Sequence, residues 1–238
     1  MTPLLRPGDP APAVTVPGAS GWLLTVEHAG RAIPTRLSSL GLPDDEIDRH
    51  IGWDPGALAL AEALRTRLDA TLAAQPYSRL VIDCNRPRGA PDLVPETSDG
   101  TRVPRNLGLE RWDVDARWDA IHAPFHAAVA AALPRAKALL SIHTYAPQRQ
   151  LDAAERPWPI GLLWRRANPL AEGLARRLAP YVEPLGLNRP YEIEDESDYT
   201  IPVHAEPCGL PHVLIEVRND RLGSPESIAH KADLLAAA

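Results

Sequence analysis

The sequence has few features of membrane, secreted or disulfide-linked proteins. No window approaches the roughly 18 consecutive apolar residues that a membrane span needs. Residues 1–20 are rich in proline and glycine and lack the apolar region of a signal peptide. Only two cysteines occur, Cys84 and Cys208, which are too few for a disulfide framework. We therefore expect a cytoplasmic protein in which Cys84 is a buried structural thiol.

Basic clusters and phosphate-binding loops are lacking as well. The chain carries 25 Lys and Arg against 31 Asp and Glu, and no basic run is interleaved with aromatic residues. Neither a glycine-rich phosphate loop nor a G-x-S-x-G nucleophile motif is present. These absences argue against nucleic-acid binding, membrane association and serine hydrolysis, and they favour a small-molecule ligand. The composition leaves the oligomeric state open.

The apolar pattern alternates between strand-like and helix-like segments. Apolar runs predict strands over residues 22–26, 77–84, 136–142, 158–164 and 212–217. Helical spacing and capping residues predict helices over residues 55–74, 112–132, 168–178 and 224–237. This alternation predicts a single three-layer α/β domain over residues 1–238, with 1–20 as an irregular lead-in. The sheet is expected to be mainly parallel or mixed, with helices on both faces.

Two residues and two stretches in this pattern bear on the expected site. Asp54 stands at the predicted N-cap of the first long helix, and Pro124 is expected to interrupt or kink the second. The stretch 87–106 is rich in proline and glycine without periodicity, which favours a functional loop such as a lid or a specificity loop. The acidic stretch 192–198 is expected to be a solvated loop.

Several predicted strands end in polar residues that suit chemistry: Glu27, His28, Asn85, Arg86, His143, Glu216 and Arg218. In an open α/β sheet, ligands bind beyond the carboxyl ends of the strands. Two imidazoles with carboxylates at one sheet edge supply the donors of a catalytic zinc site, in which three protein ligands leave one position open. Each residue alone also fits a local role, such as a hydrogen-bonded histidine or a structural salt bridge of Arg86.

Seven short runs, taken in order, resemble the N-formylglutamate amidohydrolase family. They begin with Glu-His-Ala-Gly-Arg-Ala-Ile-Pro, and together they occupy residues 27–34, 51–57, 78–87, 103–106, 124–126, 141–144 and 214–220. The resemblance spans roughly residues 22 to 222, which is nearly the whole chain.

This resemblance implies a fold related to that of zinc carboxypeptidases and one Zn²⁺ per chain. His28 and His143 are similar to the two metal-binding histidines of those enzymes. Carboxypeptidases carry an acidic ligand three residues after the first histidine, and here that position is Arg31. Asp54 is therefore the implied third ligand, with Glu27 as the alternative.

The resemblance also implies hydrolysis of an N-acyl amino acid, for example N-formyl-L-glutamate to formate and glutamate. Glu216 is the implied general base, and Asn85 with Arg86 is similar to the pair that holds the substrate carboxylate. Arg218 is a possible helper of that pair. His126 is a candidate catalytic donor or supporting residue, and a histidine in a helix core is its alternative. Residues that fit a second basic group for the glutamate side chain are Arg31, Arg102 and Arg105.

Two other functions remain open on the sequence alone. One is a zinc amidase that acts on a different N-acyl amino acid or a small peptide. The other is a metal-free relative that keeps the fold and binds carboxylates through Arg86. Convergence of His28, His143 and Glu216 at one point would favour an enzyme.

Overall fold

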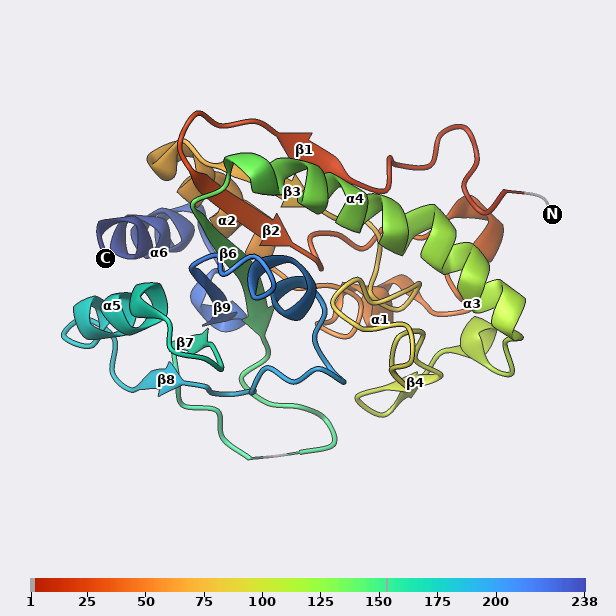
Figure 1. The fold of residues 1–238 in the computed structure, drawn as a ribbon. Helices are drawn as coiled ribbons and strands as arrows, with labels where there is room; N and C mark the ends of the chain where they lie inside the picture. Colours follow the sequence, from red (N-terminus) through yellow and green to blue (C-terminus); the bar gives the residue numbers. More distant parts are fainter. Residues whose placement is uncertain (1–2, 153) are drawn as a thin grey trace.

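The computed structural model describes residues 3–152 and 154–238, and a mixed sheet forms its centre (Figure 1). In the described residues this sheet has seven strands: Val14–Val16 (β1), Trp22–Val26 (β2), Thr71–Ala74 (β3), Ala138–Tyr145 (β6), Ile160–Leu163 (β7), Leu185–Leu187 (β8) and His212–Arg218 (β9). Their order is β1-β3-β2-β6-β9-β7-β8. The central four strands, β3, β2, β6 and β9, are parallel. The strand β1 is antiparallel to β3, and β7 is antiparallel to β9.

Helices cover both faces of the sheet, which confirms the three-layer α/β prediction. One face carries Ala57–Leu68 (α2), Pro169–Leu178 (α5) and Pro225–Ala237 (α6). The other carries Ala123–Ala132 (α4), which continues Arg111–Arg117 (α3) through a π-helical turn, Trp118–His122. The short helix Asp44–Asp48 (α1) and a second π-helical turn, Ile201–Ala205, pack on this side as well.

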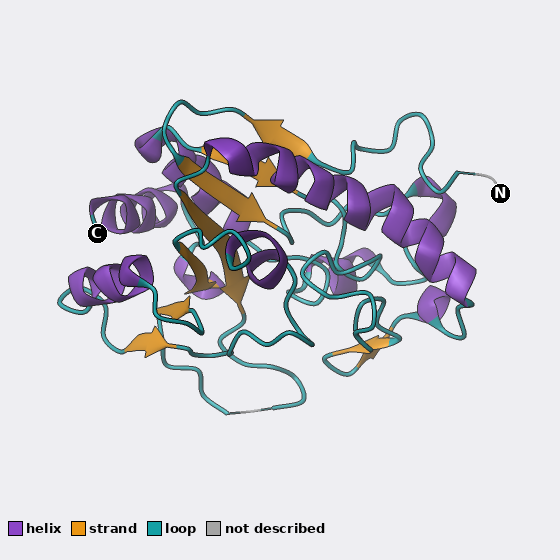
Figure 2. Cartoon of the chain, viewed as in Figure 1, coloured by secondary structure: helices purple, strands orange, loops and turns teal. Residues whose placement is uncertain are grey.

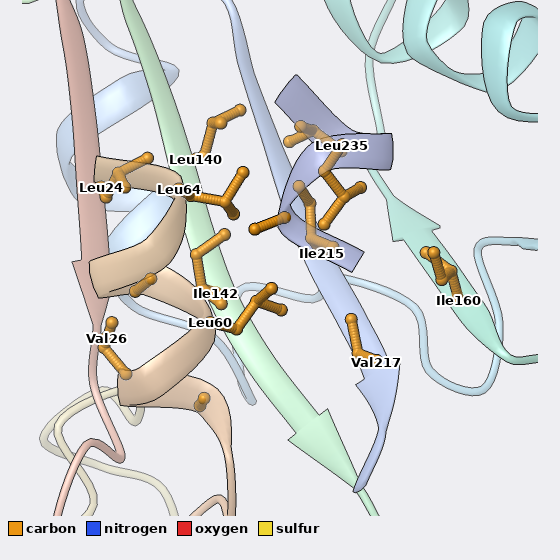
Figure 3. Close-up of a cluster of buried hydrophobic side chains, with 14 of the residues drawn as sticks. Leu24, Val26, Leu60, Leu64, Leu140, Ile142, Ile160, Ile215, Val217 and Leu235 are labelled. Carbon is orange, nitrogen blue, oxygen red and sulfur yellow. The ribbon is translucent and has the colours of Figure 1, made fainter. Parts of the chain in front are cut away.

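Alternate residues of the central strands form the core against α2 and α6. The labelled side chains of this core are Leu24, Val26, Leu60, Leu64, Leu140, Ile142, Ile160, Ile215, Val217 and Leu235 (Figure 3). Successive side chains of a strand point to opposite faces of the sheet. Because Ile142 and Ile215 face α2, the next residues along, His143 and Glu216, face the α4 side.

Long loops meet the carboxyl ends of the central strands. In Figure 2 these loops gather beyond the arrowheads of the central strands, away from the end where α5 and α6 lie. The parallel strands β6 and β9 pair so that His143 is the direct neighbour of Glu216. The register of two strands thus brings an imidazole and a carboxyl group side by side at this edge.

The predicted strand over residues 77–84 is wrong. Its place beside β2 is taken by β3, because α2 ends at Leu68 and Asp69 closes it in the left-handed conformation, with φ 48°. Residues 77–84 are buried but form turns. The carbonyls of Leu80 and Val81 accept hydrogen bonds from the side chains of Asn106 and Arg117, which replace a strand ladder. An apolar run predicts burial, but it cannot by itself distinguish a strand from a buried loop.

Three further expectations need correction. Asp54 is not the N-cap of α2; that position is Gly56, with φ 86°, and the Asp54 carboxylate has other partners. The lead-in is not wholly irregular, because Val14–Val16 forms the edge strand β1. The stretch 87–106 contains a hairpin of Thr97–Ser98 (β4) and Thr101–Arg102 (β5).

The helix predicted over residues 55–74 is too long, because α2 ends at Leu68 and residues 71–74 form β3. Other predictions are confirmed with small shifts of the ends. The interruption near Pro124 exists, since a π-helical turn directly precedes α4. Asn168 caps α5 and Ser224 caps α6 through their side-chain oxygens. The strand β8 had no clear signal in the sequence. None of the helices in residues 3–152 and 154–238 combines the length and apolar character that a membrane crossing requires.

Candidate metal centre and active site

Three predicted ligands, His28, Asp54 and His143, converge at the carboxyl edge of the sheet. His28 lies in the turn after β2, Asp54 lies just before α2, and His143 lies within β6. One potential ligand atom from each residue lies within 4.8 Å of those of the other two. All three side chains are almost completely buried. The convergence predicted from the strand ends is therefore present, although Asp54 comes from a loop.

The two imidazoles share the Asp54 carboxylate through the same ring nitrogen. His28 Nδ1 lies 3.4 Å from Asp54 Oδ2, and His143 Nδ1 lies 3.0 Å from the same oxygen. The backbone N–H of Thr144 also donates to this oxygen, at 3.2 Å. Both Nδ1 atoms therefore face one point, while both Nε2 atoms face away from it.

A further carboxylate stands at the Nε2 side of each ring. His28 Nε2 lies 2.7 Å from Asp83 Oδ1. His143 Nε2 lies 3.0 Å from Glu27 Oε2, as an ion-pair contact without hydrogen-bond geometry. Together Asp83, His28, Asp54, His143 and Glu27 form an alternating series of acids and imidazoles, here called the acid–imidazole row. Glu27 lies at its end, so the structure groups Asp54 and not Glu27 with the two histidines.

Neighbouring side chains hold the two outer carboxylates. Arg79 donates to Asp83 Oδ2 from Nε at 3.0 Å and from Nη2 at 2.7 Å. The hydroxyl of Ser141 donates to Glu27 Oε2 at 3.0 Å. In metal sites, carboxylates at the outer nitrogen of a ligating histidine fix the orientation of the ring. Asp83 and Glu27 occupy such positions for His28 and His143.

The row has strong internal electrostatics. Burial opposes the charged form of His143, yet Asp54 and Glu27 hold its pKa well above the usual value. Burial also opposes ionisation of Glu27, but His143 and the hydroxyl groups of Thr200 and Thr25 lower its pKa to about 2. Burial works against Asp54 in the same way, and the two histidines keep its pKa well below normal. The carboxylates are thus ionised around a point that attracts a cation.

The donor set fits a zinc ion. Two imidazole nitrogens and one carboxylate oxygen are a known ligand combination of catalytic zinc sites. The second carboxylate oxygen of Asp54 is buried without a hydrogen-bond partner among the described residues, and it lies 3.5 Å from both Arg79 Nη1 and His50 Nδ1. His28, Asp54 and His143 would hold the metal in this arrangement.

Glu216 lies beside this cluster, and its carboxyl group is an unusually weak acid. It is buried next to His143 through the strand register, and its Oε2 has no hydrogen-bond partner in the described part of the chain. Burial raises the pKa of Glu216 to about 8. A carboxyl group with a pKa near neutrality suits proton transfer in both directions.

A cavity of about 920 Å³ opens over these groups. His28, Asp54, His143 and Glu216 line its floor, and four arginines also line it: Arg49, Arg79, Arg86 and Arg149. Arg86 donates to Asp92 Oδ2 at 2.8 Å and to the Ser197 carbonyl at 2.5 Å. The segment 197–198, which belongs to the acidic stretch predicted as a solvated loop, therefore forms part of the cavity wall.

Several predicted site residues have partners that tie them elsewhere. Asn85 lines the cavity, but its amide donates to Asp198 and accepts from the backbone N–H groups of Tyr199 and Thr200. Arg218 binds Asp220 and a backbone carbonyl outside the cavity lining. His126 is buried behind the wall and donates to the Cys84 carbonyl.

The candidates for a second basic group also change. The described lining contains none of the three arginines expected from the sequence, Arg31, Arg102 and Arg105. Arg49 and Arg149 line the cavity in their place. Arg49 is held by Glu46, Thr101 and Asp99, whereas the Arg149 side chain has one ion pair, with Asp99 at 3.7 Å.

Sequence reasoning missed three residues of this site. Asp83 and Arg79 lie within the run 78–87, and Asp83 precedes the Asn-Arg pair by two positions, which was the available signal. His50 lies four residues before Asp54, lines the cavity and approaches Asp54 Oδ1 to 3.5 Å. The sequence carries no periodic signal for that contact, because it depends on the course of the loop before α2.

The chain is similar to proteins of one family. A family model for N-formylglutamate amidohydrolase matches residues 20–222. A gene product of Agrobacterium tumefaciens with a solved structure is 32% identical, with a TM-score of 0.93, and the match covers 98% of this chain and 95% of that one. An N-formylglutamate amidohydrolase from Ralstonia eutropha is 20% identical, with a TM-score of 0.73 and 95% of each chain covered, a likeness that shows the fold. Among curated proteins, none matches the chain.

Proposed function

Because the chain belongs to the N-formylglutamate amidohydrolase family, we propose that it is a zinc-dependent amidohydrolase that cleaves N-formyl-L-glutamate to formate and glutamate. The observation that carries this proposal is the convergence of His28, Asp54 and His143 beside Glu216 in the cavity. Membership of the family accounts for amide hydrolysis in general. The metal, the substrate and the residue roles are the proposed part.

The metal would be held by His28, Asp54 and His143. When bound, zinc polarises the acyl carbonyl and lowers the pKa of a water molecule toward about 7. Asp83 and Glu27 orient the two imidazoles from behind, so that their Nδ1 atoms stay turned to the common point. Arg79 keeps Asp83 ionised and in place.

Glu216 is the proposed general base. Its ionised carboxylate accepts the proton of the attacking water and, as the carboxylic acid, delivers it to the nitrogen of the leaving amino acid. The amide C–N bond breaks as a C–O bond forms from water, so one water molecule is consumed for each formate and glutamate released. The strand register with His143 keeps Glu216 next to the metal-binding residues throughout.

Arg86 is the proposed partner of the substrate α-carboxylate. Its guanidinium lines the cavity and is held by Asp92 and the Ser197 carbonyl. A planar guanidinium matches a carboxylate in a two-point hydrogen-bonded pair. Asp92 is half exposed, so a substrate carboxylate competes with it directly. In this arrangement the Asn85 amide holds the adjacent backbone segment, and Arg218 does not contact the substrate.

A second candidate substrate class is favoured by the charges of the cavity wall. All four lining arginines have a carboxylate partner within 4 Å: Asp99 for Arg49 and Arg149, Asp83 for Arg79, and Asp92 for Arg86. The side-chain carboxylate of glutamate therefore has to compete for a cation. An N-acyl amino acid with a neutral side chain avoids this competition, so it is the alternative.

The test combines metal content with a substrate panel. Purified protein is assayed for zinc, and formate release from N-formyl-L-glutamate and N-formyl-L-leucine is measured before chelation, after chelation and after zinc return. We expect about one zinc per chain and chelator-sensitive release, fastest with the glutamate derivative. Faster formate release from the leucine derivative would refute N-formyl-L-glutamate as the substrate and favour an N-acyl amino acid with a neutral side chain. Full activity in metal-free protein would refute the mechanism.

A further inference from the structure

Three histidines lie outside the cavity in a separate cluster on the α4 side of the sheet. His122 ends the π-helical turn before α4, His126 lies in the first turns of α4, and His204 lies in the second π-helical turn. Each of them is less than 8% exposed. None of the three lines the cavity described above. These residues are here called the imidazole cluster.

The partners of the cluster define which nitrogens carry protons. His126 Nε2 lies 2.7 Å from the carbonyl oxygen of Cys84, and His122 Nε2 lies 3.0 Å from that of Arg86. A carbonyl only accepts, so both Nε2 atoms donate. A neutral His126 then has a bare Nδ1, which accepts from His204 Nε2 at 2.9 Å. One set of tautomers satisfies all three contacts.

The surroundings of the cluster are aromatic. The ring of Trp118 stacks on His122 at 3.6 Å, and the ring of Tyr199 contacts both His122 and His126. Burial lowers the pKa of His126 to about 3 and that of His122 to about 4. The rings are therefore neutral donors at neutral pH, and they are packed against Trp118 and Tyr199.

The two carbonyls belong to the segment that faces the active site. Cys84 and Arg86 flank Asn85, whose side-chain oxygen accepts hydrogen bonds from the backbone N–H groups of Tyr199 and Thr200. The residue just before Cys84 is Asp83, the carboxylate that contacts His28. This segment has no strand ladder to hold it. At Asp83 it is held by the Leu93 carbonyl and by Arg79, and from Cys84 to Arg86 these side-chain hydrogen bonds help to set its position.

We propose that His122 and His126, supported by His204, are positioning residues that hold segment 83–86 so that Asp83 orients His28 and Arg86 faces the cavity. They act through the backbone and touch neither the substrate nor the metal. The part that concerns Arg86 rests on the proposed function. The part that concerns Asp83 and His28 rests only on the proposed metal site and not on the proposed substrate, because it is read out through metal affinity.

The test compares His126→Leu, which removes the donor, with His126→Gln, which keeps an N–H group at a similar place. The control is Phe125→Leu, a buried neighbour whose ring packs edge-on against His126 but has no group that can donate to either carbonyl. Zinc affinity is measured by competition with a fluorescent chelator, and KM and kcat are measured with N-formyl-L-glutamate. For His126→Leu we expect zinc affinity about tenfold weaker and KM about tenfold higher. His126→Gln should recover most of both, and Phe125→Leu should lower thermal stability alone.

Unchanged zinc affinity in a folded His126→Leu variant would overturn the proposal. Equal losses of zinc affinity and substrate binding in Phe125→Leu would also overturn it, and so would a His126→Gln variant that recovers neither. If His126→Leu does not fold, His122→Leu is used instead. This variant removes only the donor to the Arg86 carbonyl, so the rise in KM should be larger than the loss of zinc affinity. An unchanged KM in that variant counts against the proposal. A wild type that binds zinc but leaves N-formyl-L-glutamate intact would refute the proposed substrate, and zinc affinity would still decide the positioning role.

Discussion

The acid–imidazole row and the imidazole cluster use the same side chain in opposite surroundings. In the row, His28 and His143 lie between carboxylates, and the pKa of His143 is held well above its usual value. In the cluster, His122 and His126 face backbone carbonyls and aromatic rings, and burial lowers their pKa values to about 4 and about 3.

The difference shows how neighbours select a role for histidine. Carboxylates on both sides of a ring create a place for positive charge, which a proton or a metal ion can occupy. Carbonyls and aromatic rings leave the ring neutral, with a fixed N–H direction. The first arrangement suits ligation and the second suits the support of a backbone. Four changes test this comparison, and they are taken from the largest expected effect to the smallest.

Removing the shared carboxylate should have the largest effect. Asp54→Asn keeps the size of the side chain but removes the charge between His28 and His143. We expect zinc affinity to fall more than about hundredfold, beyond the loss typical of outer partners, and hydrolysis to disappear with it. Chelator competition and formate release measure the two effects. Zinc affinity close to that of the wild type would show that the row is not the metal centre.

Changing the carboxyl group beside the row should separate catalysis from metal binding. Glu216→Gln removes the proposed base and leaves His28, Asp54 and His143 intact. We expect kcat to fall by about 10²- to 10⁴-fold, the usual contribution of general acid–base catalysis, while zinc content stays near that of the wild type. Substantial loss of zinc in this variant would instead make Glu216 a ligand.

Removing a carboxylate at the end of the row should weaken zinc binding less than removing Asp54 in its middle. Glu27→Gln removes the charge next to His143 Nε2 and keeps an oxygen there. We expect zinc affinity to weaken by about 10- to 100-fold, measured against Glu226→Gln, which removes an equal charge from the exposed start of α6. A loss as large as that of Asp54→Asn would indicate that Glu27 is itself a ligand, as the sequence allowed.

The imidazole cluster should reveal itself in the pH dependence of stability. His126 has a folded pKa of about 3, below the roughly 6.5 of an unfolded histidine, so it takes up a proton on unfolding. The contribution of His126 to the free energy of unfolding is therefore fully present above about pH 6.5, and it is lost as the pH falls toward 3. His126→Gln removes this proton uptake. Between pH 7 and pH 5 the free energy of unfolding of the metal-free wild type should fall by about 2 kcal/mol more than that of the variant.

Urea denaturation at both pH values measures this difference. Parallel decreases in the two proteins would mean that His126 is protonated in the folded state, and the contrast between the row and the cluster would then fail. Metal-free protein is needed because zinc binding itself depends on pH.

The sequence predicted the site better than the path of the chain around it. His28, His143 and Glu216 follow from apolar runs that end in polar residues, and β2, β6 and β9 are present as expected. The second strand was misplaced because residues 77–84 are as apolar as a strand, while their backbone partners, Asn106 and Arg117, lie far along the chain. Such long-range side-chain contacts leave no periodic signal.

The same reason explains the site residues that were missed. Asp83 contacts His28 across 55 positions, and Arg79 gains its role from Asp83. His126 was identified as a residue of interest from its motif, but motif position could not distinguish a group in the cavity from one behind the wall. The catalytic roles of Glu216 and Arg86, and the ligand role of Asp54, stay predictions until the variants are measured.

The way segment 80–86 is attached has a consequence for how new specificities arise. The carbonyls of Leu80, Val81, Cys84 and Arg86 each accept from a side chain between Asn106 and His126. A wall anchored by individual side chains can be re-aimed by single substitutions in that one stretch, while the sheet that presents His143 and Glu216 is left untouched. A substitution in that stretch would shift Arg86 in the cavity wall, but it would also shift Asp83, so a change of specificity by this route is coupled to the orientation of His28.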